Sequence, residues 1–165
     1  RTVLNRHGWG SALQAGTPGT VKIAFYRGMK AGRIWDSIYC LLTCSKYSRC
    51  EIVFSDEVIG KVDYKRGIGF AFQDFPSPNW DVYELECGTY EEMSARAFFN
   101  LWEGSKFDKV GFALALMHVG QPRKGQFFPA KLCASVLGSN AYRSPGALFV
   151  DLRNQMKITL IQERE

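Results

Sequence analysis

The chain is organised around one short stretch, Phe127-Phe128-Pro129-Ala130-Lys131-Leu132-Cys133-Ala134-Ser135-Val136-Leu137-Gly138. Pro129 suits the first position of a helix, where its missing N–H leaves no hydrogen bond unmade. Gly138 suits the left-handed residue that follows a last helical turn. Leu132, Val136 and Leu137 recur at helical spacing, so the stretch predicts a short helix with one buried face.

Upstream of this helix, alternating and β-rich segments predict five strands, over residues 21–26, 50–54, 57–63, 67–72 and 80–86. Between the first two strands, residues 32–43 predict an amphipathic helix. The apolar residues expected on its buried face are Ile34, Trp35, Ile38, Leu41 and Leu42. Cys40 and Cys44 are expected to pack on or beside that face.

Two further helices are expected between the fifth strand and the central helix. Thr89 and Glu92 have the spacing of a capping box, which predicts a helix from Thr89 to about Glu103. Asp108 is predicted to cap a shorter helix that ends near Met117.

Downstream of Gly138, Ser144-Pro145-Gly146 predicts a turn into a strand over residues 147–152. Residues 156–161 also alternate, which favours a C-terminal hairpin around residues 153–155. The expected fold class is therefore α+β, an antiparallel sheet or partial barrel packed against helices. The expected organisation is an irregular arm (1–20), one domain (21–155) and a C-terminal strand with a tail (156–165).

Composition excludes several classes of function. The 165 residues carry a net charge of +5, but the basic residues are scattered and no nucleic-acid reader motif is present, so we expect no nucleic-acid partner. No apolar run is long enough to span a membrane, and no stretch has the pattern of a signal peptide. The five cysteines lack paired metal spacing, so neither a metal nor a cofactor is expected: Cys40, Cys44, Cys50, Cys87 and Cys133.

Three segments together resemble the circularly permuted NlpC/P60 (papain-like, YiiX-type) cysteine hydrolases: Lys46-Tyr47-Ser48-Arg49-Cys50-Glu51, Lys106-Phe107-Asp108 and the central helix. The resemblance covers roughly residues 21–152 and implies a papain-like permuted architecture. In that family a His, the general base, precedes the strand of the first segment, and a nucleophilic Cys opens the helix. The matching positions in this chain are Arg49 and Pro129.

Neither residue can perform the chemistry that the family's site requires. Pro129 has no nucleophile, and Arg49 is always protonated and cannot accept a proton. Three other residues could take part in a substitute site, namely Cys133, Cys50 and His118. Cys133 lies a full turn into the helix among apolar residues, which favours a buried thiol. His118 follows an apolar run, which is typical of a structural histidine at a helix end.

These observations predict a catalytically inactive domain that serves as a structural, assembly or binding protein. Its expected partners are other protein subunits, and by analogy it suits a bacteriophage virion component at the tail or collar. The expected location is the virion if the chain is phage-encoded and the cytoplasm otherwise. The alternative is an active cysteine peptidase, amidase or acyltransferase, acting on peptidoglycan or lipid-like acyl groups through Cys133 or Cys50 with His118. A third hypothesis is a small nucleic-acid-binding module.

Overall fold

A computed structural model describes residues 20–29, 34–72, 79–117, 119–120, 123–155 and 157–162. The predicted arm, apart from Thr20, lies outside these residues. The strands are β1 (Lys22–Arg27), β2 (Tyr47–Val53), β3 (Val58–Asp63), β4 (Gly67–Phe72), β5 (Trp80–Leu85) and β6 (Ile158–Gln162). The helices are α1 (Ile34–Leu42), α2 (Thr89–Leu101), α3 (Lys109–Leu116), α4 (Pro129–Leu137) and α5 (Pro145–Asn154).

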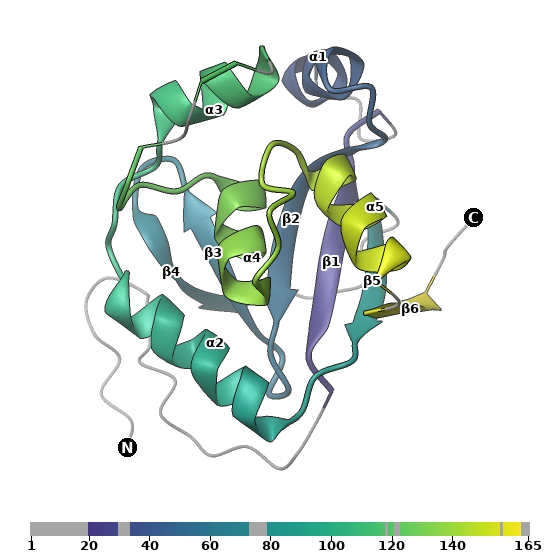
Figure 1. The fold of residues 1–165 in the computed structure, drawn as a ribbon, viewed down its shortest axis with the longest axis vertical. Coiled ribbons are helices and arrows are strands. Elements are labelled where there is room, and N and C mark those ends of the chain that lie inside the picture. The colour runs from purple at the N-terminus through teal and green to yellow at the C-terminus, as the bar shows by residue number, and fades with distance from the viewer. Residues whose placement is uncertain are drawn as a thin grey trace.

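The six strands form one antiparallel sheet in the order β4-β3-β2-β1-β5-β6. Helices α2, α4 and α5 lie across one face of this sheet, while α1 and α3 lie together at one end of the molecule (Figure 1). The prediction of an α+β fold with an antiparallel sheet is therefore confirmed, since strands and helices occupy separate layers. Within the described residues, every helix is too short or too polar to cross a membrane.

The main hydrophobic core lies between the sheet and helices α2, α4 and α5. Phe25 on β1 and Ile52 on β2 are fully buried there, as are Phe99 from α2 and Leu132 from α4. Neighbouring residues of a strand point to opposite faces, so a second, smaller cluster forms on the other face of the sheet. That cluster consists of Ala24, Val53, Ile59, Trp80 and Val82, with Tyr26 packed against it.

Helix α4 begins and ends as the sequence predicts. Pro129 occupies its first turn, and Gly138 closes it with a φ of 66°, the left-handed conformation that glycine adopts without steric cost. Leu132 and Cys133 are buried, and Val136 is half-buried. The helix therefore packs against β2 and β3 through one face and directs its N-terminal end toward α1 and α3.

The predicted strand over residues 147–152 is wrong, because this segment forms helix α5. Ser144 is its N-cap, with the hydroxyl oxygen 3.1 Å from the Ala147 N–H that it accepts, and Pro145 is in the first turn. The expected C-terminal hairpin is wrong as well. Strand β6 instead pairs with β5, with Ile158 opposite Leu85.

The N-terminal cap of α2 also differs from the prediction. Helix α2 is capped at Gly88, whose backbone N–H donates to the Glu91 carboxylate over 2.9 Å. Glu92 is turned toward the loop between β2 and β3, where it accepts hydrogen bonds from Ser55 and from Arg96. The expected pairing of Thr89 with Glu92 is therefore replaced by contacts that fix α2 to the sheet.

The apolar face predicted to be buried on α1 is exposed. The residues that face the protein interior are Asp36, Tyr39 and Cys40, whereas Trp35 is 82% exposed and Cys44 is also exposed. The remaining apolar residues of the predicted face, Ile34, Ile38, Leu41 and Leu42, are exposed too. The orientation of α1 is set by a polar contact to the sheet, described below, rather than by burial of its most apolar side.

Candidate functional site

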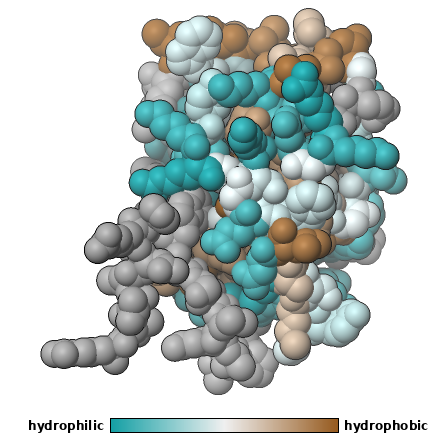
Figure 2. All heavy atoms as spheres, turned by 90° about the vertical axis from the view of Figure 1, so that its left-hand side faces the viewer, coloured by the Kyte–Doolittle hydropathy of each residue, from teal (hydrophilic) through white to brown (hydrophobic). Residues whose placement is uncertain are grey.

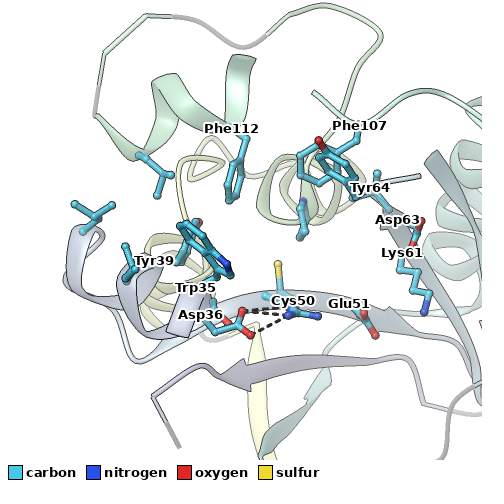
Figure 3. A pocket seen from close by; sticks show the side chains of 17 residues that line it. Trp35, Asp36, Tyr39, Cys50, Glu51, Lys61, Asp63, Tyr64, Phe107 and Phe112 are labelled. Atoms are coloured by element: carbon cyan, nitrogen blue, oxygen red, sulfur yellow. Dashed lines mark hydrogen bonds and ion pairs between the residues drawn. The ribbon is translucent and has the colours of Figure 1, made fainter. Parts of the chain in front are cut away.

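A cavity of about 640 Å³ lies between α1, α3, the N-terminal end of α4 and strands β2 and β3. Several aromatic side chains form part of its wall (Figure 3). Those labelled there are Trp35, Tyr39, Tyr64, Phe107 and Phe112. The polar residues that line it are Asp36, Ser48, Arg49, Glu51, Lys61 and Asp63.

The cavity exists because β2 and β3 separate along their length. Their ladder contains only the pairs Ile52–Gly60 and Val53–Ile59. Beyond Gly60, β3 continues to Asp63 against β4 alone, while β2 remains paired to β1 back to Tyr47. The space between residues 48–51 of β2 and residues 61–63 of β3 is therefore part of the cavity. Its floor is divided between two strands that do not bond to each other there.

Arg49 lines this cavity and forms an ion pair with Asp36. Its Nη2 lies 2.9 Å from Oδ2 of Asp36, and its Nε lies 3.3 Å from Oδ1. The guanidinium also lies 5.2 Å from the centre of the ring of Tyr26, its direct partner on the neighbouring strand β1. A charged, doubly held guanidinium can anchor an anionic group, but it cannot accept a proton.

Pro129 lines the same cavity at the N-terminal end of α4, so the two residues that the sequence resemblance assigned to base and nucleophile positions border one cavity. A proline side chain offers neither a hydrogen-bond donor nor a nucleophile. Helix α4 is nine residues long, and its first turn presents the remaining N–H groups of that end. These two positions therefore offer a cation and a hydrophobic surface.

Two thiols considered for a substitute site, those of Cys50 and Cys133, are buried. The sulfur of Cys50 points toward the cavity (Figure 3), but the residue is only 1% exposed. Burial and a hydrogen bond with the Cys133 thiol raise the pKa of Cys50 well above its ordinary value. Since the thiolate is the reactive form, this environment suppresses nucleophilic attack by Cys50 at neutral pH. Cys133 is fully buried within α4.

Of the other predicted participants, His118 lies outside the described residues. Among the residues that are described, no three His, Cys, Asp or Glu side chains come together as a group that could hold a metal ion. Glu51 lies at the floor of the cavity, and its Oε2 is buried without a hydrogen-bond partner among the described residues. Burial raises the pKa of Glu51, an effect that Lys61 and Arg49 oppose.

Sequence reasoning missed Asp36 and Tyr39. Asp36 is buried and holds Arg49, and the Tyr39 ring stacks on Phe112 of α3 with 5.3 Å between ring centres. The signal for Asp36 was a single carboxylate in the first turn of an otherwise apolar helix. Buried carboxylates require a partner, so this residue predicts a cation opposite α1.

Comparison of the chain with protein-family models, with curated proteins and with solved structures finds no match. The geometry of the cavity and the charges within it therefore carry the functional argument.

Proposed function

We propose that this chain is a catalytically silent, papain-like domain of the permuted NlpC/P60 kind that binds other protein subunits in an assembly. One observation carries the proposal. The cavity in which the resemblance expects a thiol and an imidazole is lined instead by Pro129 and by an Arg49 that is already paired to Asp36. A hydrolase requires a nucleophile, a base and a group that orients the base.

The surroundings of the cavity support binding rather than turnover. Its wall is aromatic and aliphatic, and its rim on α1 is exposed and apolar. An apolar concave surface with a few fixed charges is the usual form of a binding site for a ligand or a partner segment. By analogy with phage-encoded domains of this kind, the assembly we propose is a bacteriophage virion, at its tail or collar.

Thiol alkylation tests the proposal against the cysteine hydrolase alternative. In the native chain at neutral pH, exposed Cys44 is expected to react quickly with iodoacetamide and half-buried Cys87 more slowly, while buried Cys40, Cys50 and Cys133 react only in denaturant. A Cys44→Ser background removes the fast site. Adding Pro129→Cys to that background supplies a positive control, because it places a thiol at a helix N-terminus beside the cavity.

The decisive result is the rate at Cys50, read by peptide mass spectrometry. Labelling of Cys50 at least tenfold slower than the thiol of the Pro129→Cys variant supports the proposal. Labelling as fast as that control, together with amide or ester hydrolysis that Cys50→Ser abolishes, would overturn it.

A further inference from the structure

Helices α1 and α3 leave a large apolar surface at one end of the molecule. We name this surface the apolar end and define it by six residues: Ile34, Trp35, Leu41 and Leu42 of α1, with Met117 and Val119 after α3. Brown, hydrophobic atoms gather along the top of the space-filling view, the end at which Figure 1 places the two helices (Figure 2).

The size of the apolar end exceeds what a free monomer normally exposes. The six residues are between 51% and 82% exposed. With roughly 200 Å² for a large apolar side chain, they present on the order of 800 Å². The largest apolar patch of a typical monomer is about 300–600 Å². One side of a standard protein–protein interface is about 800 Å². The apolar end therefore matches the area that one subunit buries in a stable pair.

The small number of charged residues on α1 and α3 favours a protein partner over a membrane surface. Within α1 and α3 the charged residues are Asp36, which is buried and paired with Arg49, and Lys109, whose ammonium lies 4.5 Å from the centre of the Tyr64 ring. An interfacial membrane helix normally carries several Lys or Arg beside its apolar face, and these helices do not. With so few charges on the described residues of α1 and α3, these two helices can meet an identical pair without like-charge repulsion.

The apolar end carries both an exposed ridge and a groove. Ile34 and Leu41 are seven residues apart, so they form an outward ridge along α1. Beside this ridge, Trp35 and Leu42 face Phe112 and Leu116 across the cavity, which makes an apolar groove between α1 and α3. A two-fold interface requires a surface that carries both the protruding part and its receptacle. Ridge and groove lie side by side on this one.

From area, charge and shape together, we infer that the apolar end binds a second copy of this chain, with the α1 ridge of each subunit seated in the α1–α3 groove of the other. This inference rests on the proposed assembly role and names the first partner in it. It also assigns the cavity an occupant, because the groove that receives the ridge is the upper part of the same cavity.

The test is sedimentation velocity of the full 165-residue chain over a concentration range, compared with ridge variants. The wild-type chain, with a mass of 18.6 kDa, is expected to sediment as a dimer at micromolar concentration. Leu41→Glu and Ile34→Glu each place a charge in the apolar groove of the partner and are expected to weaken dimerisation at least 100-fold. Both side chains are exposed in the subunit, so the circular dichroism spectrum is expected to stay at wild-type values.

Met93→Glu is the matched control, because Met93 is 65% exposed on α2, which lies at the opposite end of the molecule from α1 and α3 (Figure 1). It is expected to leave the dimer intact.

A wild-type chain that is monomeric at 100 µM overturns the inference, as does an unchanged dimer in both ridge variants. A monomer that floats with phosphatidylcholine vesicles overturns it in favour of a membrane partner. If the chain is monomeric by sedimentation and its buried thiols are unreactive, self-association is rejected and the proposed function is not. If the chain is a dimer and Cys50 is alkylated fast, the proposed function is rejected and self-association is not.

Discussion

The guanidinium of Arg49 on β2 holds the carboxylate of Asp36 in the first turn of α1, with 2.9 Å between Nη2 and Oδ2. The two partners are unequally buried, since the Asp36 side chain is 10% exposed and the Arg49 side chain is 41% exposed. This contact turns Asp36 and Tyr39 inward and leaves the apolar side of α1 outward. The Arg49–Asp36 ion pair thus fixes Arg49 at the floor of the cavity and leaves the apolar side of α1 exposed at its rim.

The unequal burial predicts an unequal cost of removing each partner. Arg49→Gln leaves a buried carboxylate without its cation and is expected to lower the free energy of unfolding by about 2 kcal/mol. Asp36→Asn leaves a guanidinium that water can still reach, so its expected cost is about 1 kcal/mol. Urea denaturation of the two variants measures the difference.

The exposed pair Lys22–Glu57 provides the control for this comparison. Its atoms approach to 2.7 Å, but the Glu57 side chain is 64% exposed. Lys22→Gln is therefore expected to cost less than 1 kcal/mol, as is usual for surface ion pairs. A larger loss for Asp36→Asn than for Arg49→Gln would contradict the assignment of Asp36 as the buried partner.

Gly60 on β3 leaves room for the ring of Phe99 from α2. A Cβ atom at position 60 would lie 2.4 Å from the Cζ of Phe99, which is fully buried. Gly60→Ala is therefore expected to destabilise the fold by about 2 kcal/mol through overpacking. Equilibrium urea unfolding checks this value.

A second substitution tests the cause of that loss. Phe99→Leu shortens the side chain that the new methyl group meets, so the double variant is expected to be more stable than the sum of the two single losses predicts. Simple additivity of the two losses would show that Phe99 is not what Gly60→Ala displaces.

Asp108 fixes the start of α3 and the loop before α4. Its Oδ1 accepts the Gly111 N–H over 2.7 Å and its Oδ2 accepts the Arg123 N–H over 2.9 Å, and the residue is fully buried. Asp108→Ala leaves both donors unsatisfied and is expected to cost about 3 kcal/mol. Ser144→Ala removes one N-cap bond from α5 and is expected to cost about 1 kcal/mol. Thermal and urea unfolding measure both losses. If Asp108→Ala and Ser144→Ala lower the free energy of unfolding equally, Asp108 does not have the double role.

Glu51 predicts a pH dependence of stability. Burial raises its pKa above the ordinary value of 4.5, so the folded chain holds this proton to a higher pH than the unfolded chain does. The associated stability is fully present below the unfolded pKa and is lost as pH rises through the folded pKa. Glu51→Gln has no proton to lose, so its stability relative to wild type is expected to rise between pH 4 and pH 7. Urea titrations at both pH values measure this rise, and a relative stability that falls over the same interval would contradict the sign.

The sequence predicts the strands before α2 well, because those segments alternate and are bounded by turn residues. It also predicts the ends of α4 from Pro129 and Gly138. Helix α5 was missed although Pro145 is the same first-turn proline signal as Pro129, and Ser144 adds a side-chain N-cap that α4 lacks. The apolar residues that follow, Ala147 to Leu152, match a strand equally well when burial on one side is unknown.

The orientation of α1 could not be read from periodicity. Its most apolar side predicts burial, yet the helix is turned by a contact between Asp36 and Arg49, thirteen residues apart. The resemblance directs attention to Arg49 and Pro129, and the structure places both at one cavity. The shape of that cavity depends on the separation of β2 from β3, which no local pattern encodes.

That separation has a consequence for how the sheet opens. Two residue pairs join β3 and β4 to the rest of the sheet, and the contacts of Arg96 with Asp56 and Glu92 clamp the turn beside them. The β3–β4 hairpin is thus joined to β2 over a short length, and contacts from α2 hold it in place. In native-state hydrogen exchange, the amides of this hairpin are expected to exchange together, at a lower opening free energy than those of β1 and β5. The two residue pairs between β2 and β3 would then determine both the width of the cavity and whether the sheet unfolds as one unit.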